Sequence, residues 1–353
     1  MEGWAGVVLA AGAGTRMKSR TPKVLHPVCG KAMLAYPVEA LRRAGLRRIL
    51  VVVSPQTQEG ARALLGTSVD YVRQDHPLGT GHALLQAKGS LGGVENLLVL
   101  NGDLPLIRPD TLLRLMEAHR RAGAAVTILT STSCPPEGMG RVLRDASGRV
   151  VGIVEEVEAT STQRDNPEVN GGAYCLRAPW AWPALGSLQP RAKGEVYLTD
   201  LVAQAASQGQ VVEGCATDGW EVQGINDRLQ LARVEGMMRA RIRERWMLEG
   251  VTMMDPASTF IDADVHIGQD TVIYPNTMLL GRTRVGEACH IGPTTVVRDS
   301  SVGNGCRITA SFLEEATLED GSDVGPFSHL RPGAWLGPGV HVGNFAEVKN
   351  SRL

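Results

Sequence analysis

Residues 5–17 read AGVVLAAGAGTRM, a run of small apolar residues that passes directly into a glycine-rich turn. Residues 6–10 have the pattern of a buried strand, and the turn after them lacks side chains that would keep an anion from backbone N–H groups. The segment is not a Walker A loop, because no G-K-[ST] closes it, and Met17 replaces the third glycine of a dinucleotide fingerprint. Alone it is as typical of a plain turn as of a site. Arg16 and Lys23, with their fixed positive charges, favour a phosphate site.

The composition is that of a globular protein with two domains: 353 residues, 43% hydrophobic and 21% charged. The formal net charge of -1 gives no general attraction to nucleic acid or to an anionic membrane, so neither is an expected partner. The first residues lack the basic region of a secretory signal, and no apolar run is long enough to span a bilayer. Six scattered cysteines without a C-x-x-C pair indicate reduced, buried thiols and a cytoplasmic protein.

The first two thirds of the chain alternates strand-like and helix-like patterns. Buried strands are expected at residues 6–10, 49–53, 97–100 and 125–129, and helices at 33–44, 81–88 and 111–122. This alternation predicts an α/β fold, a Rossmann-like domain whose mostly parallel sheet is covered on both faces.

Residues 226–250 are rich in Arg, Leu, Met and Glu and contain no proline, which predicts one long helix. Its arginines would also suit nucleic acid, but the interspersed glutamates make a solvated helix face the better interpretation. We therefore expect an α/β domain over residues 1–225, a linker helix over 226–250 and a different domain over 251–353.

Beyond residue 250 an apolar residue returns at every sixth position. These residues are Ile261, Ile267, Ile273, Leu279, Val285, Ile291 and Val297, then, after one shorter step, Val302 and Ile308, and, after a longer insertion, Leu318, Val324, Leu330, Leu336, Val342 and Val348. Period six suits a triangular solenoid, in which each hexad forms one side and its apolar residue points to the axis. The pattern resembles the hexapeptide repeats of left-handed parallel β-helices, an exception to right-handed crossover. A purely structural or trimerising stalk is the alternative.

Residues 98–106, LVLNGDLPL, place Asp103 at the C-terminal end of an expected strand, where open α/β sheets bind ligands. Gly102 is expected to leave room beside it for a large polar ligand. An ionised aspartate near a triphosphate suits Mg²⁺, which keeps water ligands and needs few protein oxygens. A helix N-cap is the alternative, but Pro105 and Pro109 favour a longer loop, and therefore the metal.

Residues 74–83, QDHPLGTGHA, form a strand-to-helix loop. The amide of Gln74 can donate to and accept from the edge of a pyrimidine. Gly79 and Thr80 are placed to bring backbone amides to the face of the base. His82 begins the helix, and we interpret it as structural.

Together these segments resemble the sugar-phosphate nucleotidyltransferases, and most closely the bacterial family of bifunctional N-acetylglucosamine-1-phosphate uridyltransferases / glucosamine-1-phosphate acetyltransferases. The matching segments are residues 9–17, 22–26, 77–83, 102–106, 140–141, 153–156, 168–170, 194–200 and 224–231. The resemblance continues through the hexads, so it spans nearly the whole chain.

The resemblance implies a role for each matching position. The nucleotide and its phosphates would be held by Leu9, Ala10, Ala11, Gly12 and Lys23, with Arg16 neutralising the departing pyrophosphate and with Gln74, Gly79 and Thr80 reading uracil. Asp103 and Asn226 would hold Mg²⁺. The sugar would be bound by Gly140, Glu155, Asn170 and Asn226, in a pocket lined by Tyr197 and Thr199. The catalytic residues would be Arg16, Lys23 and Asp103.

The expected reaction is Mg²⁺-dependent transfer of UMP from UTP to N-acetylglucosamine-1-phosphate, giving UDP-N-acetylglucosamine, a cell-wall precursor, and pyrophosphate. A sugar phosphate is already a nucleophile at neutral pH, so in-line positioning and charge neutralisation suffice and no Ser–His or Cys–His pair is needed. One alternative is a related enzyme that acts on glucose-1-phosphate with UTP or dTTP. Another is a non-catalytic scaffold subunit that binds nucleotide sugars.

Two positions depart from the pattern of the family. Asn101 stands where a bulkier or hydroxyl residue is expected, and Gly172 where threonine is frequent. Either change could alter contacts with the sugar without changing the class of reaction.

For the hexad domain the resemblance implies an acetyltransferase site that is assembled between the subunits of a homotrimer and uses acetyl-coenzyme A. Residues 329–334 and 341–349 match its first sugar-phosphate-binding segments, with Arg331 and Lys349 as phosphate ligands. The catalytic histidine and the coenzyme-binding coils of the family would follow Leu353, within an unfinished repeat. We therefore expect the uridyltransferase activity to be present and the acetyltransferase activity to be absent.

Overall fold

The computed structural model describes residues 2–134, 136–191 and 194–353. It divides into two compact units, the first comprising Met1–His26 and Ala32–Val234 and the second Pro27–Lys31 and Glu235–Leu353. Among the described residues, none of the helices combines the length and the apolar character that crossing a bilayer requires.

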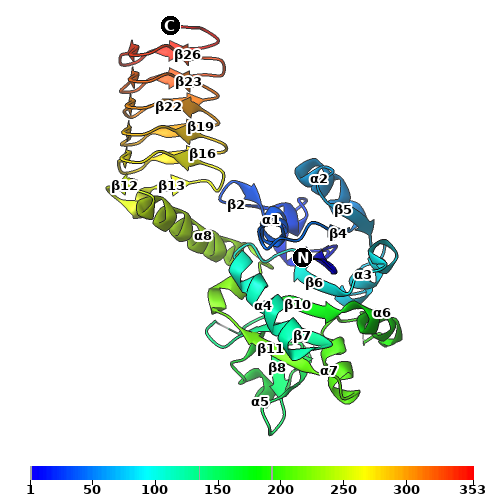
Figure 1. The fold of residues 1–353 in the computed structure, drawn as a ribbon. Helices are drawn as coiled ribbons and strands as arrows, with labels where there is room; N and C mark the ends of the chain where they lie inside the picture. Colours follow the sequence, from blue (N-terminus) through cyan, green and yellow to red (C-terminus); the bar gives the residue numbers. More distant parts are fainter. Residues whose placement is uncertain (1, 135, 192–193) are drawn as a thin grey trace. The chain divides into compact units, whose positions relative to one another are not determined.

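The first unit is built on a nine-stranded, mostly parallel sheet (Figure 1). Its strands are β1 (Trp4–Ala10), β4 (Ile49–Val53), β5 (Asp70–Arg73), β6 (Asn96–Asn101), β7 (Val126–Ser131), β8 (Arg141–Arg144), β9 (Val150–Val154), β10 (Val169–Arg177) and β11 (Val212–Ala216). Their order along the sheet is β11-β7-β10-β6-β1-β4-β5, with β8 and β9 paired beside β10. Strand β10 runs antiparallel to β6 and β7, whereas β1, β4, β5 and β6 are mutually parallel.

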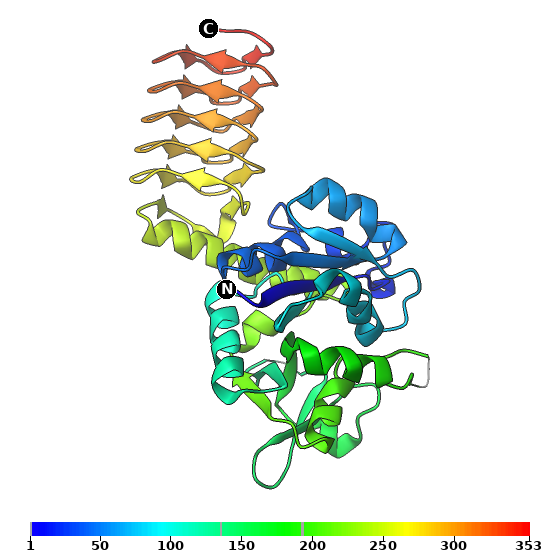
Figure 2. The same ribbon diagram turned by 45° about the vertical axis from the view of Figure 1, so that its right-hand side comes forward.

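Helices cover both faces of this sheet, as the rotated view in Figure 2 shows. They are α1 (Ala35–Arg43), α2 (Pro55–Leu65), α3 (Thr80–Gln86), α4 (Pro109–Ala122), α5 (Ser161–Arg164), α6 (Ala178–Ser187) and α7 (Asp200–Ser207), with the 3₁₀ turns η1 (Thr15–Met17), η2 (Lys23–Leu25), η3 (Lys88–Leu91) and η4 (Gly219–Val222). Side chains of α3, α6 and α7 join one core cluster, and those of α1 and α4 join the other. The expected strands and helices are confirmed, with ends within two residues of their predicted positions.

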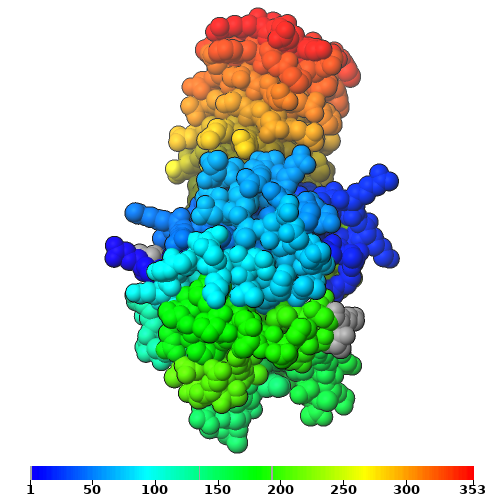
Figure 3. Space-filling view, turned by 90° about the vertical axis from the view of Figure 1, so that its right-hand side faces the viewer, coloured from blue at the N-terminus to red at the C-terminus, as the bar shows by residue number. Residues whose placement is uncertain are grey.

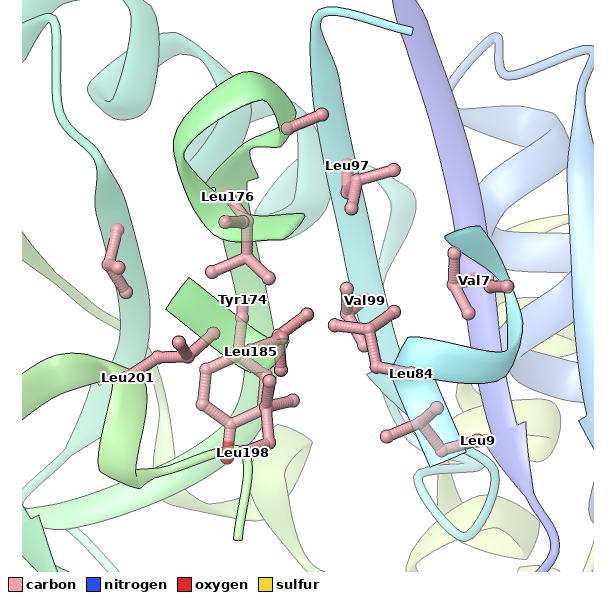
Figure 4. Close-up of a cluster of buried hydrophobic side chains, with 14 of the residues drawn as sticks. Val7, Leu9, Leu84, Leu97, Val99, Tyr174, Leu176, Leu185, Leu198 and Leu201 are labelled. Atoms are coloured by element: carbon pink, nitrogen blue, oxygen red, sulfur yellow. The ribbon is translucent and has the colours of Figure 1, made fainter. Parts of the chain in front are cut away.

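Strand β1 shows why the central strands are apolar without interruption. Val7 and Leu9 point into the core cluster that contains Leu84 and Val99, as Figure 4 shows. Val8 and Ala10 point into the cluster on the opposite face. Successive residues of a strand point to opposite faces of the sheet. Because helices cover both faces, every residue of the strand needs an apolar side chain.

The second unit is a left-handed parallel β-helix, preceded by helix α8 (Arg228–Leu248), which confirms the helix expected near residues 226–250. It has three parallel sheets. The first contains β12 (Thr252–Met253), β15 (Val272–Ile273), β18 (His290–Ile291), β21 (Arg307–Ile308), β24 (Asp323–Val324) and β27 (His341–Val342). The second contains β13 (Phe260–Ile261), β16 (Met278–Leu280), β19 (Val296–Arg298), β22 (Phe312–Glu314), β25 (His329–Leu330) and β28 (Glu347–Val348), and the third contains β14 (His266–Ile267), β17 (Arg284–Val285), β20 (Ser301–Val302), β23 (Thr317–Leu318) and β26 (Trp335–Leu336). The two short strands β2 (Pro27–Val28) and β3 (Lys31–Ala32) pair with each other, and the 3₁₀ turn η5 (Pro256–Ser258) follows β12. Figure 3 shows the coils as successive layers from yellow to red.

The apolar residue of each expected hexad from Ile261 to Val342 is buried, and Ile273, Leu279 and Val297 are completely buried, as residues on the axis of the β-helix would be. Val348, in the last coil, is only partly buried. The sequence interpretation missed one position on the axis. Between Ile308 and Leu318 there is no simple insertion, because Leu313 of β22 is also completely buried. The chain takes two steps of five residues here, and each still completes one side of the triangle.

The small residues before each strand lie at the corners of the triangle, where their hydroxyl groups bind backbone carbonyls. Thr277 Oγ1 donates to the carbonyl of Tyr274 at 2.7 Å, and Thr283 Oγ1 donates to that of Leu280 at 2.7 Å. These hydroxyl groups are buried, and the hydrogen bonds offset the cost of removing them from water. Cys289 and Cys306 occupy the same kind of position. All six cysteines are free thiols; four are buried as expected, whereas Cys134 and Cys215 are only partly buried.

Replacing Leu313 by alanine tests this register. We expect Leu313→Ala to lower the free energy of unfolding of the second unit by about 2–5 kcal/mol, because it leaves a cavity on the axis. Phe312→Ala is the matched control, since the neighbouring Phe312 is 54% exposed and should cost less than about 1 kcal/mol. Urea unfolding followed by circular dichroism measures both. Equal losses in the two variants would contradict the assignment of Leu313 to the axis.

Candidate functional site

The polar residues singled out in the sequence gather at one edge of the sheet of the first unit. The glycine-rich segment follows β1, Gln74 follows β5 and Asp103 follows β6. These strands are parallel, so their carboxyl ends meet at the same edge, the usual place for a ligand in an open α/β sheet. Two cavities open there, of about 490 Å³ and 330 Å³.

The larger cavity is lined by most of the residues expected to bind a nucleotide: Leu9, Ala11, Gly12, Lys23, Gln74, Gly79 and Thr80. Ala10 is not among them. It is 1% exposed and its side chain packs in the core on the other face of the sheet, since successive residues of a strand alternate between faces. Ala10 can therefore offer a ligand only its backbone.

The turn after β1 presents its backbone to the larger cavity. A Cβ atom added at Gly12 would meet no other atom within 4 Å, so this part of the loop borders open space. Arg16 lines both cavities and is exposed. Within the described part of the chain its guanidinium forms no ion pair. The loop thus combines backbone that borders open space with an uncommitted cation, two features of an anion site.

Gln74 is held in one orientation by its neighbours. Its side chain is 4% exposed, and Nε2 donates to the carbonyl of Gly79 at 3.1 Å and to Nδ1 of His82 at 2.8 Å. Burial lowers the pKa of His82, aided by nearby His76, so that ring is neutral and can accept. Both amide hydrogens of Gln74 are therefore engaged, and Oε1 is left to accept a hydrogen bond from a ligand.

Lys23, Asp103 and Asn226 form a compact cluster at the boundary of the cavities. Lys23 Nζ lies 2.6 Å from Asp103 Oδ2 and 3.2 Å from Asn226 Oδ1, and the side chains of Lys23 and Asp103 are only 14% and 16% exposed. A carboxylate and an amide oxygen are hard donors that converge on one cationic atom. This donor set fits Mg²⁺, which prefers oxygen ligands.

The protein supplies few such oxygens. Among the described residues, no group of three or more His, Cys, Asp or Glu side chains is placed to hold a metal. A Mg²⁺ ion at this cluster would therefore complete its coordination with water and with ligand phosphates.

The smaller cavity is lined by all of the residues expected to bind the sugar: Gly140, Glu155, Asn170, Tyr197, Thr199 and Asn226. Thr199 Oγ1 donates to Glu155 Oε1 at 2.8 Å, and Asn170 Nδ2 donates to the Tyr174 hydroxyl at 2.6 Å. Burial raises the pKa of the Glu155 carboxyl, although the bond from Thr199 opposes this. The cavity is rich in oriented acceptors and donors, as a polyhydroxylated ligand requires.

Five residues line both cavities: Arg16, Thr80, Asn101, Asp103 and Tyr197. The two cavities therefore meet at these residues, of which Arg16 and Asp103 are charged. A group transferred from a ligand in one cavity to a ligand in the other would pass this junction.

Gly102 does not leave the space that we expected from the sequence. A Cβ atom there would lie 2.9 Å from the carbonyl oxygen of Leu9, to which the Gly102 N–H donates at 2.9 Å. The glycine is needed so that the end of β6 can lie against β1. The expectation of ligand space beside Asp103 at this residue is wrong.

The two departures from the family pattern lie in contact with each other. Gly172 has a φ of +69°, and a Cβ atom on it would lie 2.7 Å from Nδ2 of Asn101. The carboxamide of Asn101 thus occupies the space that a side chain at position 172 would need. No signal in a single sequence links the two positions.

Arg228 and His26 were also missed. Arg228 Nε donates to the carbonyl of Met17 at 3.3 Å, and its Nη1 lies 3.4 Å from His26 Nδ1. Burial, and next the charge of Arg228, lower the pKa of His26. Arg228 thereby connects the end of the Arg16 turn with the end of the Lys23 turn, two residues after Asn226. In the sequence, the one sign that Arg228 belongs to the site is its position two residues after Asn226.

In the second unit, Arg331 and Lys349 lie on neighbouring coils. Arg331 Nη1 is 2.8 Å from Glu347 Oε1, and the Arg331 N–H donates to the carbonyl of Val348 at 2.8 Å. The cation of Arg331 is therefore already paired with a carboxylate, on an exposed surface.

Each of the two units matches a known protein family. Residues 6–190 match the MobA-like NTP transferase domain, and residues 264–299 match the bacterial transferase hexapeptide (six repeats). The chain is 43% identical over 349 residues to the bifunctional protein GlmU of Syntrophomonas wolfei, covering 98% of this chain and 78% of that protein. It is 43% identical over 357 residues to that of Mycobacterium tuberculosis (strain CDC 1551 / Oshkosh), covering 98% and 72%.

A solved structure resembles the chain in fold alone. It is a Bacillus anthracis protein named a glucose-1-phosphate thymidylyltransferase, in complex with a sucrose, with 20% identity and a TM-score of 0.58. The likeness covers 66% of this chain and 94% of that one.

The contact between residues 101 and 172 can be tested through stability. We expect Gly172→Ala to lower the free energy of unfolding by more than Gly209→Ala, because Gly209 has nearly the same φ of +68° but open space around it. The shared backbone strain should cost about 1–3 kcal/mol in each. Adding Asn101→Ala to Gly172→Ala should recover the difference, with a coupling of at least ~0.5 kcal/mol in urea unfolding. Purely additive effects would argue against the contact.

Proposed function

The chain belongs to the family of bifunctional GlmU proteins, and on that premise we propose that its first unit transfers UMP from UTP to N-acetylglucosamine-1-phosphate. The products are UDP-N-acetylglucosamine and pyrophosphate. The observation that carries the proposal is the junction of two cavities, one lined by the glycine-rich loop and the other by oriented polar side chains.

In this reaction UTP lies in the larger cavity and the sugar phosphate in the smaller one. A phosphate oxygen of the sugar phosphate attacks the α-phosphorus of UTP, a new P–O bond forms, and the bond to the β-phosphate breaks. Arg16 and Asp103 line both cavities, so the α-phosphorus would lie near them. Catalysis then consists of positioning and of neutralising the charge that develops on the leaving pyrophosphate.

The base would be recognised by Gln74, which lines the larger cavity but not the smaller one. Gln74 can accept from the N3–H of uracil through Oε1, because its amide hydrogens bind Gly79 and His82. This group also suits thymine, so it does not by itself separate UTP from dTTP.

Bound at Asp103 and Asn226, Mg²⁺ would neutralise phosphate charge and orient the triphosphate. Lys23 and Arg16 supply further positive charge from the protein: Lys23 lines the larger cavity, and Arg16 lines both. A scaffold subunit without catalysis would not need these groups assembled at one point.

The 2-acetamido group would distinguish N-acetylglucosamine-1-phosphate from glucose-1-phosphate. Glu155 and Asn170 both line the smaller cavity, and their partners Thr199 and Tyr174 hold each in a defined orientation. The amide N–H and carbonyl of an acetamido group would find an acceptor and a donor there. Glucose-1-phosphate offers only a hydroxyl group at that position.

For the second unit we propose that Arg331 and Lys349 bind the phosphate of glucosamine-1-phosphate. Acetyl-coenzyme A is the acyl donor that the family implies for this unit. We also propose that the chain forms a homotrimer through the β-helix, which exposes Phe312, Phe327 and Phe345. Exposed aromatic side chains of this size are typical of interaction surfaces.

Pyrophosphate release tests the proposed substrates directly. The chain is assayed with UTP or dTTP against N-acetylglucosamine-1-phosphate or glucose-1-phosphate, with and without Mg²⁺. We expect the fastest release with UTP and N-acetylglucosamine-1-phosphate, and none after chelation of the metal. A preference for glucose-1-phosphate would favour the related enzyme, and no release with any pair would favour the scaffold.

The role of Asp103 is tested by replacing its carboxylate with the carboxamide of asparagine. Asp103→Asn keeps the shape of the side chain but removes the charge that faces Lys23 and the metal, so kcat should fall by about two to three orders of magnitude. Asp110→Asn, at the exposed start of α4, is the control and should leave kcat unchanged. Circular dichroism checks that both variants fold. Near-normal turnover by Asp103→Asn would remove this residue from the catalytic site.

A further inference from the structure

A cation already lies between the two oxygens proposed to hold the metal. Lys23 Nζ is 2.6 Å from Asp103 Oδ2 and 3.2 Å from Asn226 Oδ1. Both side chains of the ion pair are more than four-fifths shielded from water, so the ammonium interacts with the carboxylate in a medium of reduced dielectric constant. An exposed surface pair would be far weaker.

This arrangement makes the cluster a poor site for a free divalent ion. Mg²⁺ and Mn²⁺ need about six oxygen ligands, and no group of three or more His, Cys, Asp or Glu side chains in the described chain is placed to hold a metal. A divalent ion beside the ammonium would also be repelled by it at short range. The pair of Lys23 and Asp103 is neutral as it stands, and adding the metal alone would leave it strongly positive.

The ammonium group of Lys23 has a second possible position, in the larger cavity. Its turn, η2, is anchored by the Leu34 N–H, which donates to the carbonyl of Val24 at 2.9 Å, so the backbone stays in place while the long side chain can move. Lys23 also lines the larger cavity, beside Gly12 and the rest of the glycine-rich loop. Phosphate oxygens bound there would offer the ammonium a partner more highly charged than one carboxylate.

We propose that Lys23 is an internal cation that occupies the metal position in the free enzyme, and that the nucleotide removes it. Phosphates in the larger cavity would attract the ammonium away from Asp103 and Asn226, whose oxygens would then be available to hold the metal. Metal and nucleotide therefore bind as a coupled pair, and the free enzyme excludes the metal. This inference rests on the proposed function for the identity of the nucleotide, but its test requires no turnover.

Binding of Mn²⁺ to the free protein, measured by electron paramagnetic resonance, tests the first half. Lys23→Met removes the ammonium and keeps an unbranched side chain. We expect wild-type protein to bind Mn²⁺ weakly, Lys23→Met to bind it roughly tenfold more tightly or better, and the control Lys88→Met, at an exposed surface position, to match wild type. Equal affinity in wild type and Lys23→Met would overturn the proposal.

A double variant identifies the ligands. Adding Asp103→Asn to Lys23→Met should return Mn²⁺ binding to the weak level of wild type. Tight binding that survives in the double variant would place the metal elsewhere and overturn the proposal. Lys23→Gln should behave as Lys23→Met, and it replaces that variant if the methionine protein does not give a native circular dichroism spectrum.

Addition of UTP without a sugar phosphate tests the second half of the proposal, the removal of Lys23 by the nucleotide. In wild type UTP should tighten Mn²⁺ binding strongly, because it withdraws Lys23 and adds phosphate ligands. In Lys23→Met the tightening should be smaller, since no ammonium remains to be withdrawn. The same or greater coupling in Lys23→Met would overturn this step. Absence of pyrophosphate release with every substrate pair would instead contradict the proposed function and leave the Mn²⁺ result for the free protein intact.

Discussion

The parallel pairing of β1 with β6 is the constraint on which the site depends. It places the carboxyl end of β1, with its glycine-rich turn, beside the carboxyl end of β6, which is followed by Asp103. The backbones approach so closely at Gly102 that a side chain there would collide with Leu9. The glycine-rich turn and the acidic residue therefore meet because the parallel register of β1 and β6 pairs Leu9 with Asn101.

Electrostatic organisation follows from this geometry. The edge of the sheet brings together one carboxylate, one ammonium and one amide oxygen, of which the charged pair is largely shielded from water. Arg16 remains uncommitted among the described residues. The charges of Lys23 and Asp103 balance each other, and Arg16 adds one positive charge. The ligand that we propose, a nucleotide phosphate with a divalent cation, would place its own opposite charges beside these groups.

In the second unit a different constraint operates. Each side of the triangle must place one apolar residue on the axis and a small residue at the corner, and the coils can meet this requirement with six residues or with five. The steps from Ile308 to Leu313 and from Leu313 to Leu318 show the shorter form. Such steps are tolerated because backbone hydrogen bonds between the strands align each coil with its neighbours. The number of residues between two strands can therefore vary without changing the pairing.

The sequence by itself determined the α/β class, the β-helix and the segments that form the site, because burial on two faces and period six both leave regular apolar patterns. Only the tertiary structure decided that Ala10 faces the core, that Gly102 serves strand packing, and that Asn101 fills the space beside Gly172. It alone joined Arg228 to His26 and Lys23 to Asp103 and Asn226. These contacts connect residues far apart in the chain, and no local pattern encodes which distant side chain will share a given space.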